Sequence, residues 1–212
     1  MENFTAPDFK DLLSVALMEG LALRNQDEAV SDDDELNHYR GANPWLWLST
    51  SGARELCRSI HAALIQINPE NTALYHINLE ITEQKLNDLA DEIDGIAASV
   101  QGTKVALLHE GLAYVADEMQ LDIVYESTRE SAATLGDNEK TELLNDLNAS
   151  GAQCILIESQ APASIVRFLT EAGFPVAQID TLTTHTDPDP SLYFDVMLKN
   201  AEAVSGAATG RQ

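Results

Sequence analysis

The second half of the chain alternates short apolar runs with helical segments, and this alternation constrains the fold more than any other feature. The apolar runs lie at residues 104–109, 122–125, 153–158 and 175–180. Continuous apolar runs of this length are typical of strands buried on both faces, and strands that alternate with helices are typical of parallel sheets. The sequence therefore predicts an α/β fold, a four-stranded parallel βα lobe, with helices at residues 110–119, 137–149, 162–172 and 191–204.

A long helical segment precedes this lobe. Residues 51–66 have an amphipathic pattern, after which Asn68 and Pro69 can end one helix and begin the next. The second helix keeps an apolar stripe up to Val100 and would be roughly 40 Å long at about 1.5 Å per residue, so we expect a backbone element that crosses the domain. We divide the chain into a remnant N-terminal segment with an acidic loop, the helical segment, the βα lobe and a polar, frayed tail, at residues 1–50, 51–102, 103–205 and 206–212.

The composition excludes several classes of partner. The net charge is −23, from 12 basic and 35 acidic residues, so no basic surface is available to bind nucleic acid or an anionic membrane. An acidic surface can attract cations, but it is also a common adaptation for solubility or salt. No apolar run is long enough for direct membrane insertion.

The N-terminus and the two cysteines do not decide the cellular compartment of the protein. The first residues lack the basic and apolar regions of a signal peptide, which indicates a cytosolic protein, a removed leader or a start inside a longer protein. Cys57 and Cys154 are far apart in sequence, and a disulfide between them cannot be inferred.

The segment from Asn43 to Ser49 (NPWLWLS) carries both tryptophans of the chain. It lies between a charged stretch that includes Asp32 and Glu35 and the start of the first long helix. We predict that the two tryptophans form a buried aromatic anchor where the chain enters the fold.

Polar residues follow three of the predicted strands. His109 ends the first strand, Glu158 the third and Asp180 the fourth. Ligands of parallel sheets bind outside the carboxyl ends of the strands, and imidazole with carboxylate suits zinc or manganese. Each residue also has a structural interpretation, as a hydrogen-bonded turn residue or as a cap of the following loop. His185 lies in a loop that could reach this edge or remain in solvent, whereas His61 and His76 are predicted on helix surfaces.

The order of these motifs resembles the zinc and manganese solute-binding proteins of ABC importers (cluster A-I, ZnuA-like) over about residues 30–205. The family motif D-P-H-V-W-L resembles residues 43–48, H-D-A-F resembles residues 109–112, and E-P-Q-F resembles residues 158–161. The closing helix is similar at four further positions, which are Tyr193, Phe194, Met197 and Asn200.

The resemblance implies two βα lobes joined by a long helix, with a Zn(II) or Mn(II) ion held between them and delivered to a membrane permease. It implies a periplasmic location and four metal ligands, of which His109 and Asp180 match. Trp45 replaces a third ligand, and most of the first lobe, which supplies the fourth, is absent. Accessory donors would be Glu158, His185 and His38, the last in the acidic loop.

Three hypotheses follow. The first is a shortened metal-binding component of zinc or manganese uptake with a partly lost ligand set. The second is a degenerate family member that acts as an accessory or protein-interaction module, as Trp45 suggests. The third, an enzyme with His109 or Glu158 as an acid–base residue, has the weakest basis, since no catalytic partner is evident in the sequence.

Overall fold

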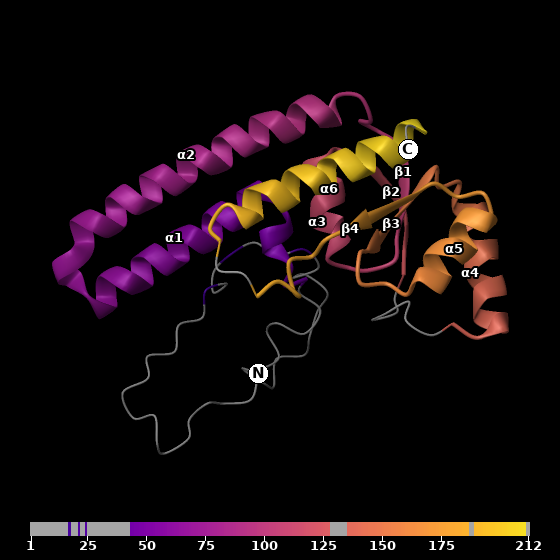
Figure 1. Cartoon of the computed structure of the whole chain (residues 1–212), viewed down its shortest axis with the longest axis horizontal. Helices are drawn as coiled ribbons and strands as arrows, with labels where there is room; N and C mark the ends of the chain where they lie inside the picture. Colours follow the sequence, from indigo (N-terminus) through magenta and orange to yellow (C-terminus); the bar gives the residue numbers. More distant parts are fainter. Residues whose placement is uncertain are drawn as a thin grey trace, which may run out of the picture.

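The computed structural model describes residues 17, 21, 24, 43–127, 135–186 and 189–210. The acidic loop with His38, and nearly all of the first apolar segment, lie outside the described residues. Figure 1 shows a βα lobe at one end of the molecule and a helical hairpin that extends from it. The predicted α/β fold is confirmed.

The sheet has four parallel strands in the order β2-β1-β3-β4. The strands lie close to the predicted runs and comprise β1 (Lys104–Leu107), β2 (Asp122–Glu126), β3 (Cys154–Glu158) and β4 (Val176–Ile179). Val105 pairs with Ile123 on one side and with Cys154 on the other, so β1 lies inside the sheet. Because the inner strands β1 and β3 are mostly apolar and buried, they need cover on both faces.

Helices supply that cover on both faces. They are α3 (Leu112–Glu118), α4 (Asp137–Ser150), α5 (Ala163–Glu171) and α6 (Leu192–Thr209). Leu107 and Leu156 pack in one core cluster with α3 and α6, whereas Ile155 and Ile157 pack in a second cluster with α4 and α5. This separation follows from the period of two along a strand. Helix α6 continues past the predicted start of the polar tail because Ala207 is buried on it.

Helices α1 (Thr50–Ile67) and α2 (Thr72–Ala97) form the hairpin, with a 3₁₀ turn at Pro69–Asn71 between them. They lie side by side, and α2 also contacts α6. The apolar stripe of α2 is buried only in its second half, at Leu86, Leu89, Ile93 and Ala97. In its first half Leu74, Ile77 and Ile81 are 52–53% exposed, so this part of the apolar stripe is not covered by the core.

The entry to α1 differs from the predicted aromatic anchor. A 3₁₀ turn, η2 (Leu46–Leu48), buries the two leucines, while Trp45 and Trp47 are only half-buried. Ser49 then caps α1, because its Oγ accepts a hydrogen bond from the Gly52 amide at 3.1 Å. The aliphatic residues therefore form the anchor, and the tryptophans face the end of the sheet.

Both cysteines are free, Cys57 half-buried and Cys154 buried. Within the described residues no helix is both long enough and apolar enough to cross a membrane.

Candidate metal site at the carboxyl edge of the sheet

The predicted site residues follow strands that run in the same direction. His109 comes two residues after β1, Glu158 ends β3, and Asp180 directly follows β4. The sheet continues from β1 to β2 on one side and from β3 to β4 on the other, so the strand order reverses between β1 and β3. Crevices at such reversal points bind ligands in open α/β sheets. However, β3 separates β1 from β4, which puts the strands of His109 and Asp180 roughly 10 Å apart at about 4.8 Å per strand.

Asn43 fixes the NPWLWLS segment to the loop after β1. Its side chain is fully buried, donates to the Glu110 carbonyl at 2.7 Å and accepts from the Trp45 amide at 3.1 Å. Its carbonyl accepts a hydrogen bond from the Tyr114 hydroxyl at 2.9 Å. The oxygen and the nitrogen of this buried amide thus each have a hydrogen-bond partner, which offsets the cost of burying them. The segment is held in register with the strand that precedes His109.

His109 is enclosed by this segment. Its side chain is 8% exposed, and the Trp45 ring packs edge-on against it with the ring centroids 4.6 Å apart. A Cβ at Gly111 would lie 2.6 Å from Trp45, so only glycine allows the indole to lie so close to this turn. Trp45 therefore occupies space directly beside His109.

A backbone amide engages one nitrogen of His109. Gly111 donates to its Nδ1 at 3.1 Å, so the proton of the neutral ring belongs on Nε2. Metal binding through Nε2 would require the ring proton to be on Nδ1 instead, where it would face the N–H group of Gly111. In this arrangement His109 is available to a metal only when the Gly111 amide turns away.

Trp47 and Tyr193 connect the segment to the end of β4. The Trp47 ring lies 5.1 Å from the Trp45 ring between centroids, and its Nε1 donates to the Thr181 carbonyl at 3.0 Å. Tyr193 on α6 donates its hydroxyl to the Trp47 carbonyl at 3.0 Å. Burial raises the pKa of Tyr193 well above its usual value, so the hydroxyl stays protonated and remains a donor. An aromatic layer therefore links the ends of β1 and β4.

Hydrogen bonds hold Asp180 at the end of β4. Asn200 on α6 accepts from the Asp180 amide and donates to its carbonyl, both at 2.9 Å. The Leu182 amide donates to Asp180 Oδ1 at 2.8 Å, and this leucine has a left-handed φ of 64°. His185 Nε2 lies 2.7 Å from Oδ2. The loop thus returns to bring an imidazole onto the carboxylate, and both side chains are about one-third exposed, at 32% and 30%.

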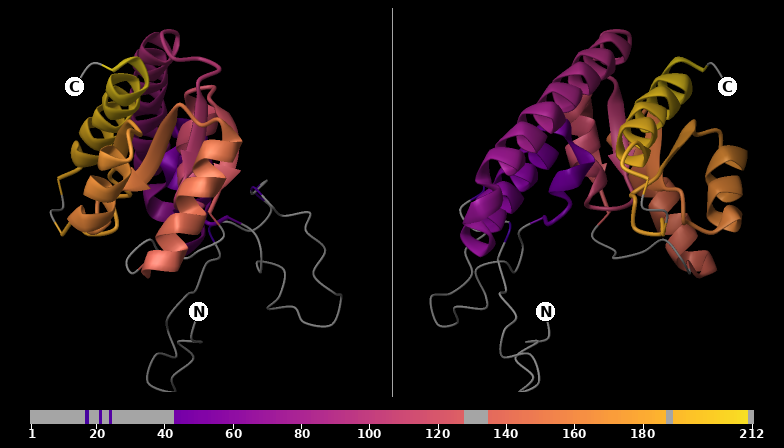
Figure 2. Two further views of the ribbon diagram at one scale, coloured as in Figure 1. Left: turned by 90° about the vertical axis from the view of Figure 1, so that its right-hand side faces the viewer. Right: turned by 60° about the vertical axis from the view of Figure 1, so that its left-hand side comes forward.

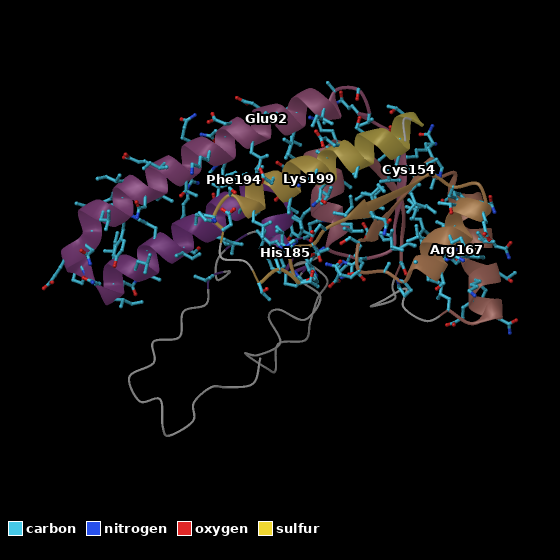
Figure 3. The ribbon with its side chains drawn as sticks, viewed as in Figure 1. Glu92, Cys154, Arg167, His185, Phe194 and Lys199 are labelled. Carbon is cyan, nitrogen blue, oxygen red and sulfur yellow. The ribbon has the colours of Figure 1, made fainter. Side chains whose placement is uncertain are left out.

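The other predicted donors do not join this pair. Glu158 is half-buried at the end of β3, and His38 lies outside the described residues. Across the described parts of the chain, no group of three or more histidine, cysteine, aspartate or glutamate side chains is arranged to hold a metal. Figure 3 shows His185 in the loop that leads to α6, well away from Cys154. The structure therefore brings together Asp180 and His185, with His109 held separately behind the tryptophans.

A polar site that the sequence did not indicate lies between α1 and α3. Glu118 accepts hydrogen bonds from the Thr50 amide at 2.8 Å and from the Thr50 hydroxyl. Burial raises the pKa of Glu118 despite these hydrogen bonds. Glu118 lines an open hollow of about 560 Å³ whose walls come from the start of α1 and from α3 rather than from the strand ends. Its role is structural, as the anchor of the first turn of α1.

Comparison with known proteins decides the family. Residues 1–207 match the family described as "Zinc-uptake complex component A periplasmic". The chain belongs to this family. Among curated relatives, the high-affinity zinc uptake system protein ZnuA of Yersinia pestis is 22% identical over 148 residues, which are 70% of this chain and 46% of that protein. The chain thus aligns with about half the length of that zinc-uptake protein.

Solved structures of similar proteins share the fold of this zinc-uptake family member. FpvC of Pseudomonas aeruginosa, solved with Ni²⁺, superposes with a TM-score of 0.75 at 16% identity, covering 93% of this chain and 69% of FpvC. The metal-dependent lipoprotein YcdH of Bacillus subtilis has a TM-score of 0.66 at 19% identity, covering 90% of this chain and 68% of YcdH. In each comparison nearly all of this chain corresponds to about two-thirds of the neighbour.

Proposed function

We propose that this chain binds a divalent transition metal, zinc first and manganese second, as a shortened solute-binding component of an ABC importer. One observation carries the proposal: Asp180 and His185 lie 2.7 Å apart, Oδ2 to Nε2, at the carboxyl edge of the sheet in a member of a zinc-uptake family. Carboxylate oxygen and imidazole nitrogen are both zinc ligands.

The contacts of Asp180 leave one oxygen for the metal. Its Oδ1 is held by the Leu182 amide, and its backbone is held on both sides by Asn200, so Oδ2 is the atom that faces His185. A metal replaces the direct hydrogen bond, and His185 can adjust because its loop is exposed. Asp180 is thereby the rigid ligand and His185 the adaptable one.

The affinity should be lower than that of a closed four-ligand site. Two protein ligands leave the remaining positions of a zinc ion to water. His109 adds a third ligand only after the Gly111 amide releases its Nδ1, and Trp45 cannot serve as a ligand. Glu158 and His38 would assist capture, and the acidic composition, with its net charge of −23, raises the local cation concentration.

The proposal extends to location and partner. A metal-delivery role places the protein in the periplasm beside the membrane permease of an importer. We propose no catalytic role, and the acid–base hypothesis for His109 or Glu158 remains a prediction without further support.

Titration calorimetry with zinc chloride on the full chain tests the proposal. Asp180→Asn and His185→Gln should each weaken binding at this edge by about ten-fold or more, and His109→Ala should have a smaller effect. Asp122→Asn, at the amino end of β2, is the matched control and should leave the titration unchanged. Equal heats for the wild type and the Asp180 and His185 variants would refute metal binding here.

A second candidate function has its own supporting observation. Trp45 packs on His109 and Gly111 as a fitted part of the fold, which suits a family member that serves as an accessory or protein-interaction module. In that case Trp45→His would destabilise the fold without a gain in zinc affinity. Tighter zinc binding by that variant would favour the transport role instead.

A further inference from the structure

Two histidines face each other across the helical hairpin, far along the chain from the carboxyl-edge site. His61 on α1 and His76 on α2 approach with Nε2 and Nδ1 3.0 Å apart and ring centroids at 4.7 Å. His76 is exposed and His61 half-buried, so solvent and ions reach the pair. The chain has five histidines, and the proposed function involves only the other three. It therefore does not need this pair.

We propose that His61 and His76 form a second metal site, which binds a borderline divalent ion such as Zn²⁺, Ni²⁺ or Cu²⁺ and links α1 to α2. The proposal does not depend on the proposed function at the edge of the sheet. Imidazole nitrogen is a good ligand for all three ions, with affinity in a given site rising from nickel to copper.

The spacing of the two nitrogens fits a shared ion. Two ligands at about 2.0–2.1 Å from one metal lie about 2.9 Å apart at a right angle and about 3.4 Å apart at a tetrahedral angle. The observed separation of 3.0 Å falls in this range, and the rings are tilted by 49° rather than stacked. The ring that donates the present hydrogen bond must place its proton on its other nitrogen, after which both lone pairs can point at the metal.

The surroundings do not repel a cation. The nearest cationic residue along α1 is Arg58, three positions before His61, and it is neutralised by Glu55 and Glu83, each at 2.7 Å. The hollow beside His61 also contains the Asn78 and Thr82 side chains. No third histidine, cysteine or carboxylate completes a metal cluster here among the described residues, so water fills the other positions.

The packing of α1 against α2 holds the two ligands of this site near each other. The two histidines come from helices that pack along their length, and a further contact between the same helices joins Arg54 to Asn87 at 2.8 Å. Each nitrogen is therefore placed before the ion arrives, which reduces the conformational entropy lost on binding. An ion held between the helices would in turn stabilise the outer part of the hairpin.

Titration of the full chain with nickel or zinc chloride tests the site. His61→Gln and His76→Gln should each weaken this binding event by about ten-fold or more, and the double variant should lose it. Asp122→Asn, at the amino end of β2 and outside both candidate sites, is the control and should leave this event unchanged. The far-ultraviolet circular dichroism of all variants should match the wild type, since the pair is at the surface.

Two further readouts separate a shared ion from a single surface histidine. Bound Cu²⁺ should show electron paramagnetic resonance coupling to two protein nitrogens, and metal should raise the midpoint of thermal unfolding more in the wild type than in either single variant. An unchanged titration for either variant, or coupling to one nitrogen, would overturn the proposal. If Asp180→Asn loses metal binding at the edge of the sheet but keeps it at the hairpin, the two sites bind metal independently of each other.

Discussion

Gly52 is the position where a single methyl group should most disturb the entry into α1. It is buried in the first turn of the helix, and a Cβ there would lie 2.1 Å from the Leu46 carbonyl oxygen and 2.9 Å from Ser49 Oγ. The carbonyl belongs to the backbone of η2 and cannot rotate away as a side chain would. Gly52→Ala must therefore displace η2 or the start of α1.

The magnitude follows from three contributions. Overfilling a packed site costs about 1–3 kcal/mol. Loss of the Ser49 cap, whose Oγ lies 3.1 Å from the Gly52 amide, adds about 0.5–2 kcal/mol. Alanine returns about 1 kcal/mol through its higher helix propensity. The free energy of unfolding should fall by about 2 kcal/mol, which lowers the thermal midpoint by about 4–8 °C for a chain of this size.

Gly95→Ala is the control. Gly95 lies in α2 with no atom within 4 Å of its would-be Cβ, so the same substitution should stabilise the protein by about 0.5–1 kcal/mol. Urea unfolding followed by circular dichroism measures both variants. The reasoning is refuted if Gly52→Ala falls within half a kilocalorie per mole of the wild type, or if both variants lose the same amount.

Three other predictions concern the site, the buried carboxyl and the thiols. Trp45→His should tighten zinc binding by roughly ten-fold when the new imidazole joins His109, and a titration that equals the wild type would contradict this. Burial raises the pKa of Glu118 above its unfolded value, so its contribution to stability is full at low pH and is lost as pH rises through the folded pKa. The stability of the wild type relative to Glu118→Gln should therefore fall as the pH rises above the usual pKa of a glutamate side chain, and a difference that does not change with pH would contradict this. Iodoacetamide on the folded protein should label the half-buried Cys57 before Cys154, which is 0% exposed. Burial raises the pKa of both thiols, that of Cys154 to about 11, so exposure decides the order, and early labelling of Cys154 in the mass spectrum would contradict this.

The sheet could be predicted from the sequence because each strand is a short apolar run with helices on either side. Such runs allow few other arrangements, and the observed strands start and end within a few residues of the predicted ones. The order of the strands was not predictable in the same way. Nothing in the runs indicates that β3 lies between β1 and β4, which is why His109 and Asp180 are less close than the sequence suggested.

The pairing of Asp180 with His185 depends on loop geometry that the sequence does not show. His185 reaches Asp180 through a turn in which Leu182, a residue that rarely has a positive φ, adopts 64°. By contrast, the pair of His61 and His76 had a usable signal. The two residues are nearly equidistant from the turn at Pro69, so an antiparallel hairpin must bring them opposite each other.

Helix α2 is one continuous helix with unequal support along its length. Its second half is held by the core through Leu86 and Ile93, while Leu74 and Ile77 in its first half face solvent. Local opening requires less free energy where fewer apolar contacts must break. Backbone amides near Ile77 should therefore exchange with deuterium well before those near Ile93, and a protease should first cut the hairpin at its outer end. An ion bound by His61 and His76 would link the two helices there and slow both amide exchange and proteolysis. A chelator that removes the ion would restore the faster rates.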